Sequence, residues 1–377
     1  MKITSVRSVP ASIAVKPDKM ITNWRGSHGT SAFVLVRVET DAGIEGVGEA
    51  TVMPMWSGET VWSAKTLIDE VLGPLVVGKD PTDIEPIADS LDREVSRNWF
   101  TKAAVEMACW DIWGKAEGKP VYELLGGPHR DRTIRCRYSM AAYPPDRAAL
   151  RARELVAEGF TTIKVKVGPD PAGDVARVRA VRDAVGPKIA VTIDANCGWD
   201  TETAIRCCTE LADEDLALVE QPTPDGDYDA LARVRRAIDP PVMADDMCFD
   251  LVNARELLRH EACDCIAVYP GKQGGILRAK QMVELAAEHD VVCSIGSNLE
   301  WDVGTAAMGH LVIGCENMKV EVHPGDMLGP VYHEERIVKQ PLRIEGPLVT
   351  VPDAPGLGVE VDWQKVERFR IPPPRWD

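Results

Sequence analysis

The sequence lacks the features that mark membrane, secreted or nucleic-acid-binding proteins. None of its hydrophobic runs approaches transmembrane length, and the start, Met1-Lys-Ile-Thr-Ser-Val6, has no apolar core of a secretory signal. Lysine and arginine (43) are outnumbered by aspartate and glutamate (59), and the net charge of −16 argues against nucleic acid and anionic membranes as partners. We therefore expect a cytoplasmic protein that binds neither nucleic acid nor membrane.

The sequence also lacks the paired cysteine spacing of a zinc site, although it contains ten cysteines. Cys207 and Cys208 are adjacent, and Cys263 and Cys265 flank the start of an expected strand. Without a secretion signal, these cysteines are expected to be reduced thiols. There is no low-complexity linker, and 377 residues suit a barrel plus a smaller domain better than one ordinary domain.

Three acidic residues recur at a regular interval: Asp194, Glu220 and Asp245, separated by 26 and 25 residues. Each follows a short apolar run, and a strand–helix unit of a parallel barrel has about this length. We expect each carboxylate at the C-terminal end of a successive strand, which is the face where such barrels hold their active sites. Three converging carboxylates repel each other unless a cation lies between them. A hard divalent ion, most simply Mg²⁺, is the natural partner.

The alternation of strand and helix continues on both sides of these residues, as expected for βα units on a parallel sheet. The expected strands are 161–166, 189–193, 216–219, 241–244, 265–269, 291–296 and 318–321, and the expected helices are 145–158, 174–185, 201–214, 228–238, 251–261, 277–289 and 305–313. Lys164 and Lys166 are two residues apart on a strand, so both face the barrel mouth. An amine beside a metal and another amine has a depressed pKa and can serve as a general base.

The first part of the chain differs from this pattern. Residues 3–10, 31–40 and 45–50 are expected to form an antiparallel sheet, with a turn at 41–43. Helices are expected at 59–72, 84–96 and 101–116. Strands followed by helices indicate an α+β domain.

Taken in order, these residues form a pattern that resembles the enolase superfamily, in its muconate-lactonizing enzyme / mandelate racemase subgroup. The pattern consists of Lys164-x-Lys166, Asp194-Ala-Asn196, Glu220-Gln-Pro222, Ala244-Asp-Asp246 and Gly274-Gly275, with Gly46-Val-Gly-Glu49, 103–115 and 124–127 earlier in the chain. The resemblance implies an α/β fold, a modified (β/α) TIM-type barrel with an N-terminal α+β capping domain. The domains would be a capping domain at 1–127, a catalytic barrel at 128–339 and a C-terminal segment at 340–377 that returns to the capping domain. Specificity loops would lie at 19–30 and 51–59.

The resemblance also implies roles for individual residues. Asp194, Glu220 and Asp245 would bind Mg²⁺. Lys166 would remove the proton α to a substrate carboxylate, and Lys164 would lower the pKa of Lys166 and contact the carboxylate. Asp246 stands where the family usually has glutamate.

The chain departs from the family at the sixth strand. Relatives that racemise carry a second lysine there, and Tyr269 occupies that place, with Lys272 nearby. A tyrosine is a poor base near pH 7 but can donate a proton, or it can simply pack. We therefore expect β-elimination of water from a hydroxylated carboxylate, that is, a dehydratase. A racemase, epimerase or cycloisomerase is the alternative, and a non-catalytic metal-binding relative is the least favoured interpretation.

The substrate is expected to be a small carboxylate held by loops over the barrel mouth, and the protein is expected to form a homo-oligomer. A lone loop arginine or histidine is more often simply solvated, but the family places both loops at the mouth. Trp24 and Trp56 could form an apolar or cation-binding wall. The expected substrate-binding residues are Trp24, Arg25, His28, Trp56, Asn196, Asp246, Lys272, Asn298 and Glu321.

Overall fold

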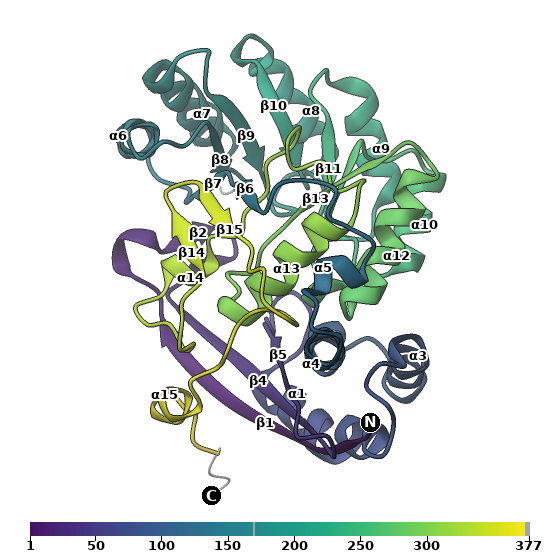
Figure 1. The fold of residues 1–377 in the computed structure, drawn as a ribbon. Coiled ribbons are helices and arrows are strands. Elements are labelled where there is room, and N and C mark those ends of the chain that lie inside the picture. Colours follow the sequence, from purple (N-terminus) through teal and green to yellow (C-terminus); the bar gives the residue numbers. More distant parts are fainter. Residues whose placement is uncertain (169, 374–377) are drawn as a thin grey trace, which may run out of the picture.

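The computed structural model describes residues 1–168 and 170–373. Its N-terminal part is built on a three-stranded antiparallel sheet in the order β1-β4-β5, which Figure 1 shows in purple beside the barrel. A separate hairpin, β2-β3, projects from this part. The strands are β1 Ile3–Ala14, β2 Ile21–Asn23, β3 Gly26–His28, β4 Thr30–Thr40 and β5 Glu45–Ala50.

Helices cover this sheet: α1 Val61–Leu67, the π-helical turn η2 Ile68–Leu72, α2 Gly73–Val76, α3 Ile84–Glu94, α4 Trp99–Glu117 and α5 Val121–Leu124. The long helix α4 is buried along most of its length and packs directly on β5. A Cβ on Gly46 would fall 2.1 Å from the carbonyl oxygen of Ala108, and one on Gly48 would fall 1.8 Å from that of Ala104. The two glycines therefore let strand and helix backbones touch.

The barrel consists of seven parallel strands in sequential order from β7 to β13. Most of its strand residues are buried, as expected for strands covered on both faces. The strands are β7 Tyr138–Met140, β8 Thr162–Lys166, β9 Ala190–Asp194, β10 Leu216–Glu220, β11 Val242–Ala244, β12 Cys265–Val268 and β13 Val292–Ile295. The intervening helices are α6 Pro145–Ala157, α7 Pro171–Val185, α8 Thr201–Glu210, α9 Tyr228–Ala237, α10 Leu251–Arg259, α11 Pro270–Gln273, α12 Ile276–Ala287 and α13 Asp302–Gly314. The fold predicted from the sequence, an α/β barrel with an N-terminal α+β domain, is confirmed.

The strand expected at 318–321 does not form. Met318 makes a single parallel bridge to Cys293, and the chain then turns, with the N–H of Val322 bonded to the carbonyl oxygen of Lys319 at 3.0 Å. Only Met318 and Val320 of the expected strand are buried, so too few apolar side chains are available to hold a strand against the barrel.

The C-terminal segment contacts both the N-terminal part and the start of the barrel. Strands β14 Arg343–Glu345 and β15 Leu348–Thr350 form a sheet with β6 Thr133–Arg135, and the short helices α14 Gly329–Tyr332 and α15 Trp363–Arg368 flank them. Isolated bridges join Ala11 to Arg370 and Val15 to His333. The Pro-Pro-Pro-Arg-Trp run at 372–376 lies outside the described residues from 374 onward.

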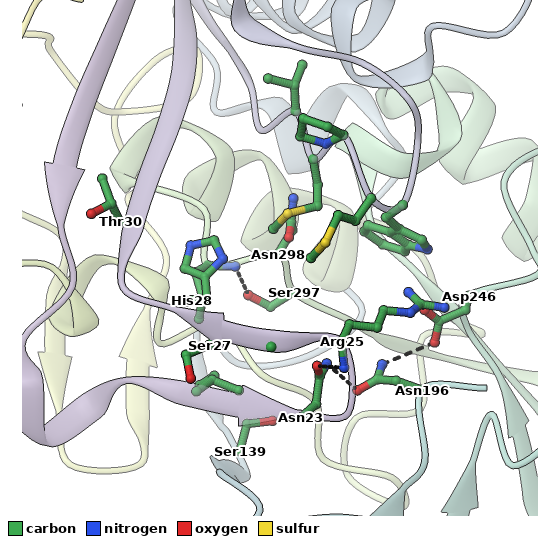
Figure 2. A pocket seen from close by; sticks show the side chains of 18 of the residues that line it. Asn23, Arg25, Ser27, His28, Thr30, Ser139, Asn196, Asp246, Ser297 and Asn298 are labelled. Carbon is green, nitrogen blue, oxygen red and sulfur yellow. Dashed lines mark hydrogen bonds and ion pairs between the residues drawn. The ribbon is translucent and has the colours of Figure 1, made fainter. Parts of the chain in front are cut away.

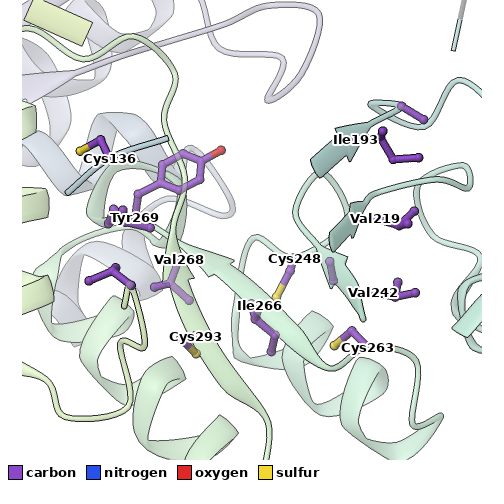
Figure 3. Packing of buried hydrophobic residues seen from close by; sticks show 14 of the residues in the cluster. Cys136, Ile193, Val219, Val242, Cys248, Cys263, Ile266, Val268, Tyr269 and Cys293 are labelled. Carbon is purple, nitrogen blue, oxygen red and sulfur yellow. The ribbon is translucent and has the colours of Figure 1, made fainter. Parts of the chain in front are cut away.

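A close-packed apolar core fills the space between the barrel strands and the helices that surround them. Figure 3 shows Val268 at the end of β12 and Tyr269 just after it, with Cys248, Cys263 and Cys293 in the same cluster. Buried cysteines of this kind behave as small hydrophobic residues, and burial raises the pKa of the Cys248 thiol to about 12. No helix in the described part of the chain is long and apolar enough to cross a membrane.

Candidate active site

A pocket of about 810 Å³ lies where the barrel mouth meets the N-terminal part. The β2-β3 hairpin and the loop at 51–59 form one wall, and the ends of the barrel strands form the other (Figure 2). Its lining includes Arg25, Ser27, His28, Phe33, Met53, Met55, Trp56, Ser139, Lys164, Lys166, Asn196, Asp245, Asp246, Tyr269, Ser297, Asn298 and Asp326. The two loops that the sequence placed over the mouth are therefore in contact with this pocket.

The lysine pair and the first carboxylate lie on adjacent strand ends. Parallel pairing sets Lys166 opposite Asp194, and Asp194 opposite Glu220. The Lys166 ammonium lies 2.5 Å from Asp194 Oδ2 and donates to Asn196 Oδ1 at 2.7 Å. The Lys164 ammonium bridges two carboxylates, 3.0 Å from Asp194 Oδ2 and 2.7 Å from Glu220 Oε1. Both lysines are thus held in fixed positions at the floor of the pocket.

A second cationic side chain supports Glu220 from below. Arg137, which is 1% exposed, donates to Glu220 Oε2 at 2.6 Å. Burial raises the pKa of Glu220, and the neighbouring Arg137 and Lys164 only partly oppose this effect. Burial also raises the pKa of Asp194, but the two lysines outweigh it and the net pKa is lowered. A buried carboxylate needs such partners to remain charged.

The three carboxylates fit Mg²⁺ by their chemistry, because they supply hard oxygen donors on three successive strand ends. In residues 1–168 and 170–373, no three acidic, histidine or cysteine side chains are arranged as a ready metal-binding group. The carboxylates are turned onto cationic side chains instead, and Lys164 holds a positive charge between Asp194 and Glu220. That bridging ammonium shows that a cation is accommodated there, and a divalent ion would compete with it.

The carboxylates also control the charge of Lys164. Burial and the nearby Arg137 lower its pKa, but Asp194, Glu220 and Asp245 outweigh them, and the net pKa is raised above that of an ordinary lysine. A cation bound by these three carboxylates would reduce this effect.

Tyr269 and Lys272 meet the third carboxylate, Asp245. The Tyr269 hydroxyl lies 3.3 Å from Asp245 Oδ1, and burial, followed by the charge of Asp245, raises its pKa well above that of an ordinary tyrosine. The Tyr269 phenol is therefore protonated near neutral pH and is a poor general base. Its ring leaves no room for a side chain at position 296, where a Cβ on Gly296 would fall 2.3 Å from it.

Lys272 does not line the pocket, so its expected substrate contact is wrong. Its side chain is 0% exposed, and its ammonium lies 2.5 Å from Asp245 Oδ1, 2.9 Å from the Asp245 carbonyl and 2.8 Å from the Ala267 carbonyl. All three ammonium protons are used in these bonds. Lys272 thus holds Asp245 in place.

The β2-β3 hairpin is fastened across the mouth by three side chains. The Trp24 indole N–H donates to the Asn196 carbonyl at 2.7 Å, and Asn23 Nδ2 donates to Asn196 Oδ1 at 3.2 Å. Arg25 pairs with Asp246 Oδ1 at 3.0 Å, and Asn196 Nδ2 donates to Asp246 Oδ2 at 3.1 Å, as Figure 2 shows. Asn196 therefore touches the hairpin, Asp246 and Lys166.

Six of the nine expected substrate-binding residues line the pocket: Arg25, His28, Trp56, Asn196, Asp246 and Asn298. Trp24 does not, because its ring lies over Gly168 and Gly198 at the rim and remains 46% exposed. Only Trp56 of the expected tryptophan wall therefore faces the pocket. Glu321 does not line the pocket either: it is exposed and pairs with Arg130, which donates to the carbonyl oxygens of Cys315 and Glu316 just after α13.

Sequence reasoning missed two charged residues of the site, Arg137 and Asp326. Asp326 is 4% exposed, lines the pocket, accepts a hydrogen bond from the N–H of Leu328 at 2.9 Å and forms no ion pair with the described side chains. The sequence pointed to Glu321 in place of Asp326, because the eighth strand was expected to end at residue 321. Arg137 gave no signal, since a single arginine between two short strands has no motif.

Comparison with known proteins agrees with this geometry. The family model for the mandelate racemase / muconate lactonizing enzyme N-terminal domain matches residues 3–126, and the enolase C-terminal domain-like model matches residues 147–365. The chain belongs to the enolase superfamily, in the mandelate racemase / muconate lactonizing enzyme subgroup.

The relatives and solved structures described below are named as cycloisomerases, epimerases or racemases. The chain is 32% identical to muconate cycloisomerase 1 of Rhodococcus opacus, covering 97% of this chain and 96% of that protein. It is 32% identical to the L-Ala-D/L-Glu epimerase of Bacillus subtilis, covering 95% and 97%. Among solved structures, the N-succinyl Arg/Lys racemase of Bacillus cereus matches with a TM-score of 0.94 at 27% identity, covering 98% of both chains. The dipeptide epimerase of Enterococcus faecalis, complexed with Mg and the dipeptide L-Leu-L-Tyr, matches at 0.90 and 31% identity, covering 96% of this chain and 100% of that chain.

Proposed function

We propose that this protein is a Mg²⁺-dependent enzyme that transfers a proton at the carbon α to a substrate carboxylate, with Lys166 as its only proton-transfer base. The carrying observation is the arrangement around Asp194. Lys166 lines the pocket and is aligned by Asp194 at 2.5 Å and Asn196 at 2.7 Å. Asp194, Glu220 and Asp245 are the proposed Mg²⁺ ligands, and when bound the ion would supply positive charge to the oxygens of an enediolate. Enolase-superfamily enzymes in general combine a lysine or histidine base with Mg²⁺.

The remaining charged side chains have supporting roles in this proposal. Lys164 contacts the substrate carboxylate and adds positive charge beside the developing enediolate. Arg137 and Lys272 hold Glu220 and Asp245 in position from outside the pocket. The substrate carboxylate is thereby placed in a region of positive potential at the pocket floor.

A single base favours reactions on one face of the substrate. Racemisation requires a second base. Tyr269 is unsuited to that role because it is a protonated phenol. Lys272 is unsuited because all three of its ammonium protons are used in hydrogen bonds. An intramolecular addition, in which a carboxylate closes on a double bond and Lys166 protonates the α-carbon, needs only one base. We therefore infer an isomerase of the cycloisomerising type, a class also present among the similar relatives.

β-Elimination of water is the second candidate. The relatives reported above do not include a dehydratase, so the first expectation from the sequence has no support from them. Two observations favour it nevertheless: the Tyr269 hydroxyl lines the pocket as a proton donor, and Asp326 offers an unpaired carboxylate to a cationic group. A hydroxylated amino acid would offer a hydroxyl leaving group to Tyr269 and an ammonium group to Asp326.

The test is exchange of the α-proton in D₂O over a panel of carboxylates, with Mg²⁺ and with chelator, read by mass spectrometry and chiral chromatography. Incorporation of one deuterium at the α-carbon of a cyclised product supports the first candidate, and α-proton exchange with loss of water supports the second. Exchange with inversion would refute the single-base proposal. Absence of exchange from every substrate would refute proton transfer itself.

A further inference from the structure

A buried chain of hydrogen bonds runs from His28, which lines the pocket, into the interior of the molecule. His28 Nε2 lies 2.8 Å from Ser31 Oγ, and the same oxygen lies 2.7 Å from Nε2 of His333. The other ring nitrogen of His333, Nδ1, lies 2.8 Å from the carbonyl oxygen of Gly329. Ser31 is 0% exposed and His333 is 1% exposed, so each has to satisfy its hydrogen bonds within this chain.

The carbonyl oxygen of Gly329 determines where the protons lie, because it can only accept. Nδ1 of His333 must therefore carry a proton. Burial lowers the pKa of His333 to about 4, so near pH 7 the ring is neutral and its Nε2 has a free lone pair. The Ser31 hydroxyl has one proton and must donate it to that nitrogen. His28 Nε2 must then carry the proton that it donates to Ser31 Oγ.

This sequence of donors leaves Nδ1 of His28 without a proton. Burial lowers the pKa of His28 as well, which keeps its ring neutral near pH 7. Nδ1 takes no hydrogen bond from the described residues, and it is not among the fully buried polar atoms that lack a partner. Figure 2 shows the His28 ring projecting from the hairpin that covers the pocket. The free lone pair is thus accessible from the pocket.

We propose that Ser31 and His333 fix His28 as a hydrogen-bond acceptor, and that the pocket thereby selects carboxylate substrates that carry a hydroxyl or amide N–H group away from the α-carbon. A histidine without fixed partners could change its tautomer to suit either a donor or an acceptor. The relay removes that choice, so a substrate group that only accepts would meet a bare lone pair and lose affinity. The substrate part of this inference rests on the proposed function, whereas the tautomer part does not.

The tautomers can be measured directly. In protein labelled with ¹⁵N-histidine, the seven rings give separate long-range ¹H–¹⁵N patterns, assigned by His28→Phe and His333→Phe. We expect His28 to be protonated only on Nε2 and His333 only on Nδ1, which are opposite tautomers. Ser31→Ala should release His28 into a mixture, while Ser12→Ala, on the neighbouring strand, should change nothing. A protonated or averaged Nδ1 on His28 in the unmodified protein would overturn the proposal, even if the Ser31 variant failed to fold.

The selectivity is measured with pairs of carboxylates that differ only in a distal O–H or N–H group and its methylated counterpart. The unmodified protein should exchange the α-proton of the donor-bearing member with about 3- to 10-fold higher kcat/KM, the range of one neutral hydrogen bond. His28→Phe should abolish that preference, and His28→Asn, which retains an oxygen acceptor near the place of Nδ1, should restore part of it. An unchanged preference in His28→Phe would refute the selectivity. No exchange with any carboxylate would refute the proposed function, and the tautomers would still decide the role of the relay.

Discussion

At the scale of single residues, the site is an arrangement of buried charges in which each cation is paired with at least one carboxylate. Lys164 joins Asp194 to Glu220, Arg137 supports Glu220, and Lys272 supports Asp245. Removing one member of a buried ion pair costs more than the pair itself contributes, because an uncompensated charge remains. Lys166 differs from the others because Asn196 shares its ammonium, and its side chain faces the pocket.

The first prediction concerns Lys166. Lys166→Ala should lower α-proton exchange by at least about 10³-fold, because it removes the amine proposed as the base at the pocket floor. Asp194 would keep Lys164 as a partner, so the folded state should persist. Exchange rates in D₂O and circular dichroism would check both statements. Lys188→Ala, a lysine of the turn before β9, is the control and should exchange like the unmodified protein; a Lys166 variant that does the same would disprove the assignment.

The second prediction concerns Tyr269. Tyr269→Phe removes only the hydroxyl, and the ring can remain packed against Gly296. If the phenol donates a proton to a departing group, product formation should fall about 10²–10⁴-fold while exchange by Lys166 continues. Comparing the two rates in one reaction separates the steps. Tyr122→Phe, which alters a tyrosine bonded to Asp353 outside the pocket, should leave the ratio of the rates unchanged. Equal losses of exchange and product would show that Tyr269 instead positions Asp245.

At the scale of elements, carboxylates of the N-terminal part cap helices of the barrel. Glu106 on α4 accepts the N–H groups of Ile276 and Leu277, both at 2.8 Å, at the start of α12. Glu49 on β5 accepts those of Trp301 at 2.6 Å and Gly304 at 3.0 Å, at the start of α13. Each carboxylate satisfies N–H groups that a helix start leaves free and faces its positive end. The match of the Gly46-Val-Gly-Glu49 motif to the family therefore has a structural cause.

The third prediction tests these caps. Glu106→Gln and Glu49→Gln replace one accepting oxygen with an amide that cannot accept, leaving a buried N–H unsatisfied. Each should reduce the free energy of unfolding by about 1–3 kcal/mol, the cost of one buried unsatisfied group. Urea denaturation measures this loss. Glu123→Gln, on the exposed face of α5, should have almost no effect. A loss as large in Glu123→Gln would mean that the change of charge, and not the cap, is responsible.

The strand–helix alternation could be predicted from the sequence because it rests on local apolar periodicity, and Asp194, Glu220 and Asp245 lie at strand ends as the spacing required. The strand predicted at 318–321 was wrong, because this segment is joined to the barrel by a single bridge and does not form a continuous ladder. The positions of Lys272 and Trp24 also escaped prediction. The Lys272 ammonium points toward backbone carbonyl oxygens, and the Trp24 ring lies against two glycines. Both positions depend on tertiary contacts that no local sequence pattern encodes.

At the scale of the whole molecule, three segments distant in sequence meet at His310. This residue of α13 accepts the N–H of Tyr122, from the end of the N-terminal part, on Nδ1 at 3.3 Å. Its Nε2 donates to the carbonyl oxygen of Leu357, in the C-terminal segment, at 3.1 Å. The ring also stacks on Tyr122, with centroids 5.6 Å apart. The neutral form satisfies both bonds, and a second proton would break the bond to Tyr122.

The last prediction is that acid destabilises the protein through His310. Burial lowers its pKa to about 4 in the folded state, against about 6.5 in the unfolded chain. Between these values the unfolded state binds more protons, so stability rises with pH. The contribution is complete above about pH 6.5 and is lost as pH falls toward 4, amounting to about 3 kcal/mol at 1.36 kcal/mol per pKa unit. Urea denaturation from pH 7.5 to 4.5 should show this slope, and His310→Gln, which does not titrate, should reduce it by about one proton near pH 5. Exposed His289→Gln should keep the full slope, and an unreduced slope in His310→Gln would assign the acid sensitivity to other groups, His333 first among them.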